Sequence, residues 1–362
     1  MLELMLALLV ADKPQDPTPP LPYEVREVEI ASVDDVTLAG TLTVPEGEGP
    51  WPVAVLLTGS GPQDRDEALF GHRPFLVLAD NLTRQGIAVL RYDDRGFGAS
   101  TGDFAAATNL DFAKDADAAA RFADDLPELD AVGFIGHSEG GLVGPMAAAM
   151  EDSPADFLVM LAGPGINGVE TLATQLFAIR TALGIPEQQA QRESELNRDV
   201  LQSVADEADV ETVREKMTTL VRVQFSLPED GPLEEAQQAD VDATVEQAMA
   251  GVSSEWFRQF LITDPSEFLA QLDVPVLALF AEKDLQVVVE PNLPAVEAAL
   301  DDAPTDDVTV VTLPGLSHFF HEVGGTPAAA FMYENAEQTM APAVWETIGP
   351  WIGARFGNDD AE

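Results

Sequence analysis

A serine at position 138 lies in a pattern that can make its hydroxyl a nucleophile. Residues 136–140 read G-x-S-x-G, after an apolar run at 131–135 and before a helix-like run at 142–150. A strand, this pattern and a helix together form a sharp turn that exposes the serine hydroxyl. Glycines flank the serine because side chains there would collide with the strained backbone. The pattern predicts a nucleophile at Ser138, and a chance glycine-rich turn is the alternative.

A serine hydroxyl attacks a carbonyl carbon once a base has taken its proton, and the usual base is a histidine held by a carboxylate. The chain has four histidines. We predict His318 as the base, because it follows the last predicted strand, 308–313. His321, just downstream, is the weaker alternative. His72 precedes the nucleophile, against the order Ser, Asp, His of this kind of site, and His137 is expected to point away from the hydroxyl.

The carboxylate that holds the base should follow the preceding strand, which we predict at residues 274–280. Asp284 lies in the loop after it and is the predicted acid, with Glu282 as the alternative. A solvated turn carboxylate is the other interpretation in a chain this acidic. The order Ser138, Asp284, His318 matches the order expected for the fold. This chemistry requires no metal and no cofactor, and we predict neither.

Two backbone N–H groups must stabilise the negative oxygen that forms during acyl transfer. One is the N–H of Glu139, directly after the nucleophile. The other should come from the loop after the predicted strand 53–57, where the N–H of Ser60 is our first choice and that of Gly61 the second. A plain glycine-rich turn is the alternative.

Two charged runs, at residues 63–66 and 93–96, also follow predicted strand ends. Each contains aspartate beside arginine. Ion pairs among them would fix the loops around the site, and a solvated charge cluster is equally compatible with the sequence. We assign neither run a catalytic role.

Strands and helices alternate along the chain in a rhythm that indicates an α/β fold, a mostly parallel doubly wound sheet with helices on both sides. The rhythm stops between residues 166 and 268, where the composition is helical and no strand is evident. We therefore predict a proline-rich, signal-like segment at 1–22, two parts of the core at 23–165 and 269–362, and a helical cap insertion at 166–268.

The predicted cap contains apolar side chains that could line an acyl pocket, and Trp256 and Phe260 are the residues we assign to substrate binding, together with Gly61 of the core. The alternative is that most apolar cap residues only pack the cap against the core. The wider set of candidates is Leu176, Phe177, Leu183, Phe225, Trp256, Phe257 and Phe260.

Acidic residues dominate the charge: 64 Asp and Glu stand against 18 Lys and Arg, a net charge of −46. Repulsion on this scale opposes folding in dilute buffer and is screened in molar salt, where the Debye length falls to about 3 Å. We interpret the acidity as a halophilic adaptation, and an acidic protein without it is the alternative. Nucleic acid is excluded as a partner because no basic patch exists. The absence of cysteine excludes disulfides and thiol catalysis.

A short apolar run at residues 4–11 precedes a proline-rich stretch and resembles the core of a signal peptide. An acidic residue, Glu3, stands where positive charge is expected, so export and a cytoplasmic location both stay open. No stretch approaches the roughly 20 apolar residues of a membrane span.

Four motifs, at residues 59–66, 91–96, 136–141 and 313–318, resemble the α/β-hydrolase superfamily and, within it, the bacterial EstD-type serine carboxylesterases. The resemblance implies an eight-stranded core with a helical cap, a metal-free mechanism and small acyl esters as substrates. It assigns the nucleophile, acid and base to Ser138, Asp284 and His318. One departure is Thr58, where many hydrolases have a histidine before the glycine.

The leading hypothesis is therefore a carboxylesterase that acts on small-molecule esters of short to medium acyl chains. A peptidase or an acyl-CoA thioesterase would use the same triad, although a thioesterase would gain from basic residues that this chain lacks. A binding protein on a hydrolase scaffold is a third hypothesis, and such proteins typically lose a triad residue. The sequence makes no prediction of oligomeric state.

Overall fold

The computed structural model describes residues 15–331, 333 and 336–357. The strands are β1 Tyr23–Ala31, β2 Thr37–Pro45, β3 Trp51–Leu57, β4 Ala88–Tyr92, β5 Leu129–His137, β6 Ala155–Leu161, β7 Val276–Ala281 and β8 Val308–Leu313. They form one eight-stranded sheet in the order β1-β2-β4-β3-β5-β6-β7-β8. Strands β1 and β2 form an antiparallel hairpin, β2 is antiparallel to β4, and the other neighbours are parallel.

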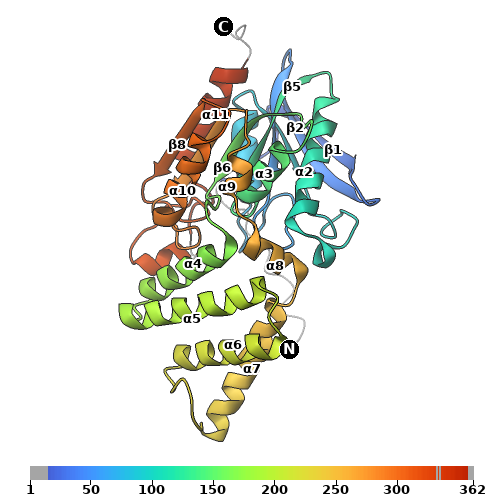
Figure 1. Cartoon of the computed structure of the whole chain (residues 1–362). Helices are drawn as coiled ribbons and strands as arrows, with labels where there is room; N and C mark the ends of the chain where they lie inside the picture. The colour runs from blue at the N-terminus through green and yellow to red at the C-terminus, as the bar shows by residue number, and fades with distance from the viewer. Residues whose placement is uncertain (1–14, 332, 334–335, 358–362) are drawn as a thin grey trace, which may run out of the picture.

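Helices cover both faces of this sheet (Figure 1). The helices of the core are α1 Pro74–Thr83, α2 Asn109–Asp124, α3 Gly140–Ala148, α9 Ser266–Leu269, α10 Val289–Asp301 and α11 Ala343–Phe356, with the 3-10 turns η1 Phe104–Ala106 and η2 Pro327–Phe331. Helices α2, α3, α9 and α10 share one apolar core with the sheet, and α1 and α11 share another on the opposite face. The predicted doubly wound α/β fold is confirmed.

The central strands show why the sheet is covered on both faces. In β3, Val53, Val55 and Leu57 belong to the core under α2 and α3. Ala54 and Leu56 between them belong to the core under α1 and α11. Because successive side chains of a strand point to opposite faces, a continuous apolar run is buried only when helices pack on both sides.

Five further helices lie between β6 and β7: α4 Gly168–Ala182, α5 Glu187–Ala205, α6 Val210–Gln224, α7 Glu235–Gly251 and α8 Glu255–Ile262. Figure 1 shows them at one end of the sheet, with α4 and α8 next to the core. Helices α5, α6 and α7 share a small apolar core of their own. By contrast, Val169 of α4 and Phe260 of α8 pack into the core that α2, α3, α9 and α10 share with the sheet. The assignment of residues 166–268 as a separate cap stays a prediction.

The apolar run at residues 4–11, which we interpreted as signal-like, lies outside the described residues. Among the residues that the structure describes, no helix is both long and apolar enough to cross a membrane.

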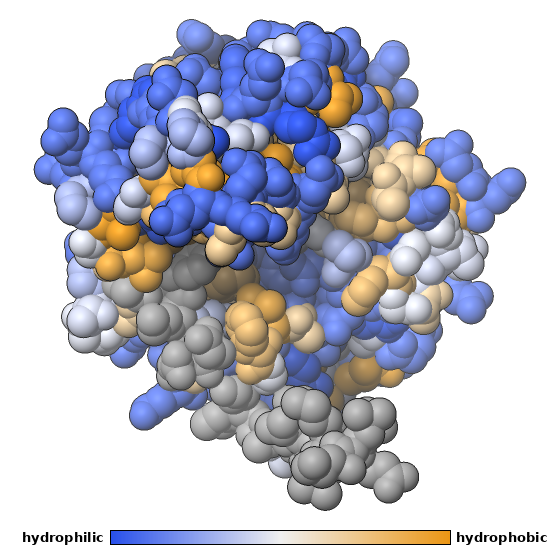
Figure 2. All heavy atoms as spheres, turned by 90° about the horizontal axis from the view of Figure 1, so that it is seen from below, coloured by the Kyte–Doolittle hydropathy of each residue, from blue (hydrophilic) through white to orange (hydrophobic). Residues whose placement is uncertain are grey.

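Hydrophilic residues cover most of the face that is seen from the side of α4–α8, with smaller hydrophobic areas between them (Figure 2). The whole chain has only 18 basic residues against 64 acidic ones. Many of the basic side chains are already paired, as in Arg192 with Glu229 and Arg214 with Glu246. Exposed pairs contribute only about 0–1 kcal/mol each, so they cannot offset repulsion among the remaining carboxylates.

Salt should therefore stabilise the fold. We expect the unfolding midpoint to rise by roughly 10 °C between low and about 2 M sodium chloride, since a few kcal/mol of relieved repulsion corresponds to a shift of that order in a domain this large. Thermal unfolding followed by circular dichroism measures it. A variant with exposed carboxylates of α6, α7 and their connection changed to amides should respond less: Glu211, Glu215, Asp230, Glu235, Asp240 and Asp242.

Sodium sulfate is the necessary comparison, because excluded salts strengthen hydrophobic burial in any protein. A midpoint that is flat in chloride, or a variant that responds as strongly as the parent, would contradict the halophilic interpretation.

Candidate active site

The predicted turn around Ser138 is present between β5 and α3. Ser138 has a φ of +54°, a left-handed conformation that is uncommon for a residue with a side chain. A Cβ atom on Gly136 would lie 2.0 Å from the carbonyl oxygen of Gly140, and one on Gly140 would lie 2.2 Å from that of Leu57. Only glycine fits at these two positions, which was the reason for the sequence prediction.

The predicted acid and base lie side by side. Nδ1 of His318 is 2.8 Å from Oδ2 of Asp284, and both side chains are buried. The other carboxylate oxygen of Asp284 accepts the backbone N–H groups of Gln286 and Val287, at 2.7 and 2.9 Å. With both oxygens engaged, Asp284 is fixed in orientation, and its contact places the proton of a neutral His318 on Nδ1 and leaves Nε2 free to act as a base.

The two alternative residues are engaged elsewhere. Glu282 lies at the surface, where it accepts hydrogen bonds from Lys283 Nζ and from the N–H of Gly315. Nδ1 of His321 lies 2.6 Å from the Ser317 hydroxyl. Burial, followed by the charge of the nearby His72, lowers the pKa of His321 to about 4.

The loop after β3 lies beside Ser138, as the predicted oxyanion donors require. Ser60, Ser138 and Glu139 line the same pocket. Gly61, our second choice, has a φ of +90° and lines a smaller adjoining pocket of about 30 Å³. Thr58, the departure from the usual hydrolase pattern, donates its hydroxyl to Asp94 at 2.8 Å and so joins the loop after β3 to the loop after β4.

Two carboxyl groups, the partly buried Asp94 and the buried Glu139, line the small pocket beside the loop after β3. Burial raises the pKa of Asp94 to about 8, although its hydrogen bonds from Thr58 and Gln63 act in the opposite direction. Burial also raises the pKa of Glu139, against the hydrogen bonds from Trp256, Ser60 and Asn109. The raised pKa of Asp94 reduces its negative charge near neutral pH, and with it the repulsion that a negative oxygen near Ser60 would meet.

The Glu139 side chain joins four parts of the chain, and sequence reasoning missed it because only its backbone N–H was considered. Its Oε1 accepts from Trp256 Nε1 of α8 at 2.7 Å and from Asn109 Nδ2 of α2 at 2.9 Å. The hydroxyl of Ser60 also bonds to this carboxylate. Glu139 thus ties helix α8 and the loop after β3 to the turn that carries Ser138.

The pocket at Ser138 has a volume of about 190 Å³. Of the predicted substrate-binding residues, Trp256 and Phe260 line it, and the side chains that complete its wall include Leu172, Phe257, Gln175 and Gln286. The rings of Trp256 and Phe260 are stacked at 6.1 Å, because residues four apart on a helix share one side.

Four members of the wider set, Leu176, Phe177, Leu183 and Phe225, are not among the residues that line this pocket. Leu183 and Phe225 are 54% and 44% exposed, at the C-terminal ends of α4 and α6, and Leu176 packs against the core shared by α5, α6 and α7. An apolar residue at a helix end looks the same in sequence whether it faces a pocket or solvent.

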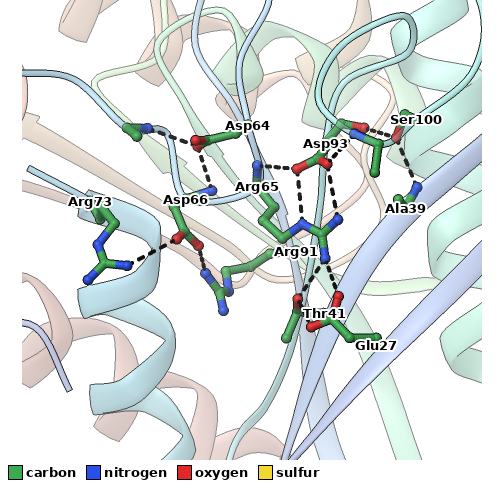
Figure 3. Close-up of polar contacts among 12 residues, drawn as sticks. Glu27, Ala39, Thr41, Asp64, Arg65, Asp66, Arg73, Arg91, Asp93 and Ser100 are labelled. Carbon is green, nitrogen blue, oxygen red and sulfur yellow. Dashed lines mark hydrogen bonds and ion pairs between the residues drawn. The ribbon is translucent and has the colours of Figure 1, made fainter. Parts of the chain in front are cut away.

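The two charged runs pair with each other and fix the loops around the site (Figure 3). Arg65 binds Asp93 through two contacts of 2.9 and 3.0 Å, and it also reaches Glu27 at 2.7 Å. Asp66 is paired with Arg91. The loops after β3 and β4 are thereby held together, which favours the structural interpretation over a solvated cluster.

Among the described residues, no group of three or more histidine, aspartate or glutamate side chains is arranged to hold a metal ion.

Comparison with known proteins gives one matching family model and one esterase of similar sequence. The family model described as serine aminopeptidase, S33, matches residues 73–230. Esterase EstD of Thermotoga maritima is 28% identical over 250 residues, which cover 69% of this chain and 50% of EstD. The chain therefore spans half the length of this relative.

Solved structures resemble the whole fold. The Pyrococcus furiosus esterase Pf2001 has a TM-score of 0.54 at 15% identity, over 93% of this chain and 92% of that one. Est1E of Butyrivibrio proteoclasticus, solved with ferulic acid, has a TM-score of 0.50 at 18% identity, over 91% and 99%. Together with the sheet order and the turn at Ser138, these matches show the α/β-hydrolase fold. In sequence the chain is similar to EstD, in agreement with the resemblance inferred from the motifs.

Proposed function

We propose that the protein is a serine hydrolase that cleaves carboxylic esters through an acyl-enzyme. The observation that carries the proposal is the contact of 2.8 Å between His318 Nδ1 and Asp284 Oδ2, next to the left-handed turn of Ser138. The chain order of the three residues is the one typical of this fold. The similarity to EstD, which is named an esterase, supports esters as the substrate class.

In this mechanism His318 Nε2 takes the proton of the Ser138 hydroxyl while its oxygen attacks the ester carbonyl carbon. The N–H groups of Glu139 and Ser60 donate to the oxyanion. The bond between the acyl carbon and the alcohol oxygen then breaks, and the alcohol leaves with the proton from His318. Water attacks the acyl-enzyme with the help of the same base, which releases the carboxylic acid and restores Ser138.

The pocket favours short acyl chains. Its volume of about 190 Å³ is below the roughly 300–1,000 Å³ of pockets that hold drug-sized ligands. Trp256 and Phe260 provide an apolar wall, and Gln175 and Gln286 add polar groups. A short acyl group fills such a space without displacing α8.

A substrate panel tests this proposal. We expect kcat/KM for p-nitrophenyl esters to be highest at two to four acyl carbons and to fall at least about tenfold by ten carbons, because one methylene in an apolar pocket changes binding by about 1–3 kcal/mol. Aminoacyl anilides and acyl-CoA belong in the same panel, the former because the matching family model is described as a serine aminopeptidase. Faster cleavage of an anilide or a thioester would replace the ester proposal, and binding without cleavage of any substrate would indicate a binding protein.

The same panel applied to Phe260→Ala should show the optimum at longer chains, since this change enlarges the pocket. Phe225→Ala is the matched control, because Phe225 is 44% exposed at the end of α6. An unchanged preference in Phe260→Ala would reject this wall as the determinant of chain length.

A further inference from the structure

A buried glutamate and a buried histidine lie beside the candidate triad and are not used by the mechanism above. Glu67 and His137 are 2% and 4% exposed. Oε1 of Glu67 lies 2.7 Å from His137 Nδ1 and also accepts the backbone N–H of Gly59 at 2.8 Å. The opposite ring nitrogen of His137, Nε2, lies 3.0 Å from the backbone carbonyl oxygen of His318.

These contacts determine where the protons of the pair lie. A carbonyl oxygen only accepts hydrogen bonds, so Nε2 of His137 must carry a proton to bond His318. The contact between Nδ1 and Glu67 holds a second proton. The two contacts are satisfied together when His137 is an imidazolium and Glu67 a carboxylate, which is a charge-assisted pair of zero net charge.

The electrostatic surroundings of His137 agree with this arrangement. Burial alone would lower the pKa of His137, but the charge and hydrogen bond of Glu67, the carbonyl of His318 and the charge of Asp284 together raise it. Among the described residues, the rings in contact with His137 include the imidazole of His318, at 4.8 Å between centroids, and the apolar rings of Phe319 and Phe320.

We propose that Glu67 and His137 are positioning residues. Together they set the geometry of the loop after β3, which carries Ser60, and of Ser138 and His318. Glu67 holds Gly59, whose neighbour Ser60 supplies the second oxyanion donor. His137 precedes Ser138 in the chain and holds the backbone of His318. The inference rests on the proposed function, because it assigns the pair a part in that same reaction.

The packing at Gly59 shows how closely these parts approach one another. A Cβ atom added to Gly59 would lie 3.2 Å from Glu67 Oε1, 3.3 Å from Ser138 Cβ and 3.5 Å from His137 Nδ1. Glu67 itself has a left-handed φ of +53°, and such strained positions cluster at functional sites. Loss of the pair should therefore displace Ser138 and the loop that carries Gly59, and it should have little effect on substrate binding.

The test is the Glu67→Gln variant, which keeps the size of the side chain and an acceptor for Gly59 but removes the negative charge. Without this charge, His137 loses its second proton at alkaline pH. A neutral His137 can then keep only one of its two hydrogen bonds, to residue 67 or to the carbonyl oxygen of His318. We expect kcat for a short ester to fall about 10²-fold at pH 8–9, as for a small misplacement of reacting groups, with KM changed less than threefold. The ratio of variant to parent kcat should recover only below about pH 6, because burial without the charge of Glu67 lowers the pKa of His137.

His137→Gln provides a second variant, which carries no charge at any pH. It should lower kcat by a similar factor, with a ratio to the parent that does not change with pH. Glu193→Gln is the matched control, because Glu193 is also fully buried and paired, with Arg180 at 2.9 Å in α4 and α5. It should lower the unfolding midpoint and leave kcat unchanged.

The pair can also be observed without substrate. With four histidines in the chain, nitrogen-15 NMR of labelled protein should show one imidazole, His137, doubly protonated at pH 8, and this signal should disappear in Glu67→Gln. An inactive parent with this signal would overturn the ester proposal and leave the pair in place. A neutral His137 in the parent, or a folded Glu67→Gln variant with parental kcat across the pH range, would overturn the inference.

Discussion

Replacement of Ser138 with alanine should lower kcat for a short-chain ester by about 10⁶-fold, equivalent to roughly 8 kcal/mol of activation free energy. The change removes the atom that forms the acyl bond, whereas the pocket of about 190 Å³ around it and the N–H groups of Ser60 and Glu139 stay in place. KM should therefore change little. A residual rate above that in water is expected from the oxyanion donors.

The matched control is Ser253→Ala, since Ser253 is exposed and bonds only the backbone of Ala250 among the described contacts. Mass spectrometry after treatment with an organophosphonate gives an independent measurement. The parent and the control should gain the mass of one phosphonyl group, and Ser138→Ala should gain none. Inhibition of the parent without any gain in mass would exclude Ser138 as the nucleophile.

The parts of the site that depend on local sequence could be predicted. The turn at Ser138 needs two glycines that are visible in the pattern, and the structure shows backbone atoms 2.0 and 2.2 Å from where their Cβ atoms would lie. Asp284 and His318 could be selected because parallel strands end at the same edge of a sheet. Chain order and strand ends were sufficient to place their side chains next to each other.

Contacts that depend on side chains from distant segments could not be predicted. Glu67 meets His137 across 70 positions of sequence, and Trp256 meets Glu139 across 117. His137 and Glu139 lie in the G-x-S-x-G pattern, but nothing near Glu67 or Trp256 in sequence indicates that these side chains contact it. The pairing of Arg65 with Asp93 was anticipated only as one of two alternatives, because a charged run is compatible with either a solvated or a buried position.

The direction that a helix faces was equally hard to predict. The apolar pattern of α8 indicates that one side is buried, but it does not say whether Phe260 faces the core, a neighbouring helix or a pocket. In the structure Phe260 faces the core and the pocket: it packs into the core that α2, α3, α9 and α10 share with the sheet, and it also lines the pocket at Ser138. By contrast, Phe225 lies at the C-terminal end of α6 and is exposed.

The second large effect is expected for the base. His318→Ala should lower kcat by about 10⁶-fold, and the double variant with Ser138→Ala should be little slower than either single one, because residues that act as a unit are not additive. Asp284→Asn should cost about 10⁴-fold, since it leaves the geometry but disturbs the tautomer that His318 needs. Steady-state kinetics at one saturating ester concentration distinguish these levels.

The alternative base is tested by His321→Asn, whose amide oxygen can replace Nδ1 as the acceptor for the Ser317 hydroxyl, now 2.6 Å away. Because burial and the charge of His72 lower the pKa of His321 to about 4, this imidazole is a weak base at neutral pH, and its ring lies against Tyr333. The variant should retain kcat within a few fold. If a folded His321→Asn enzyme lost turnover while His318→Ala kept it, the base would have to be reassigned, and the contact between His318 and Asp284 would then serve only the packing of the loop.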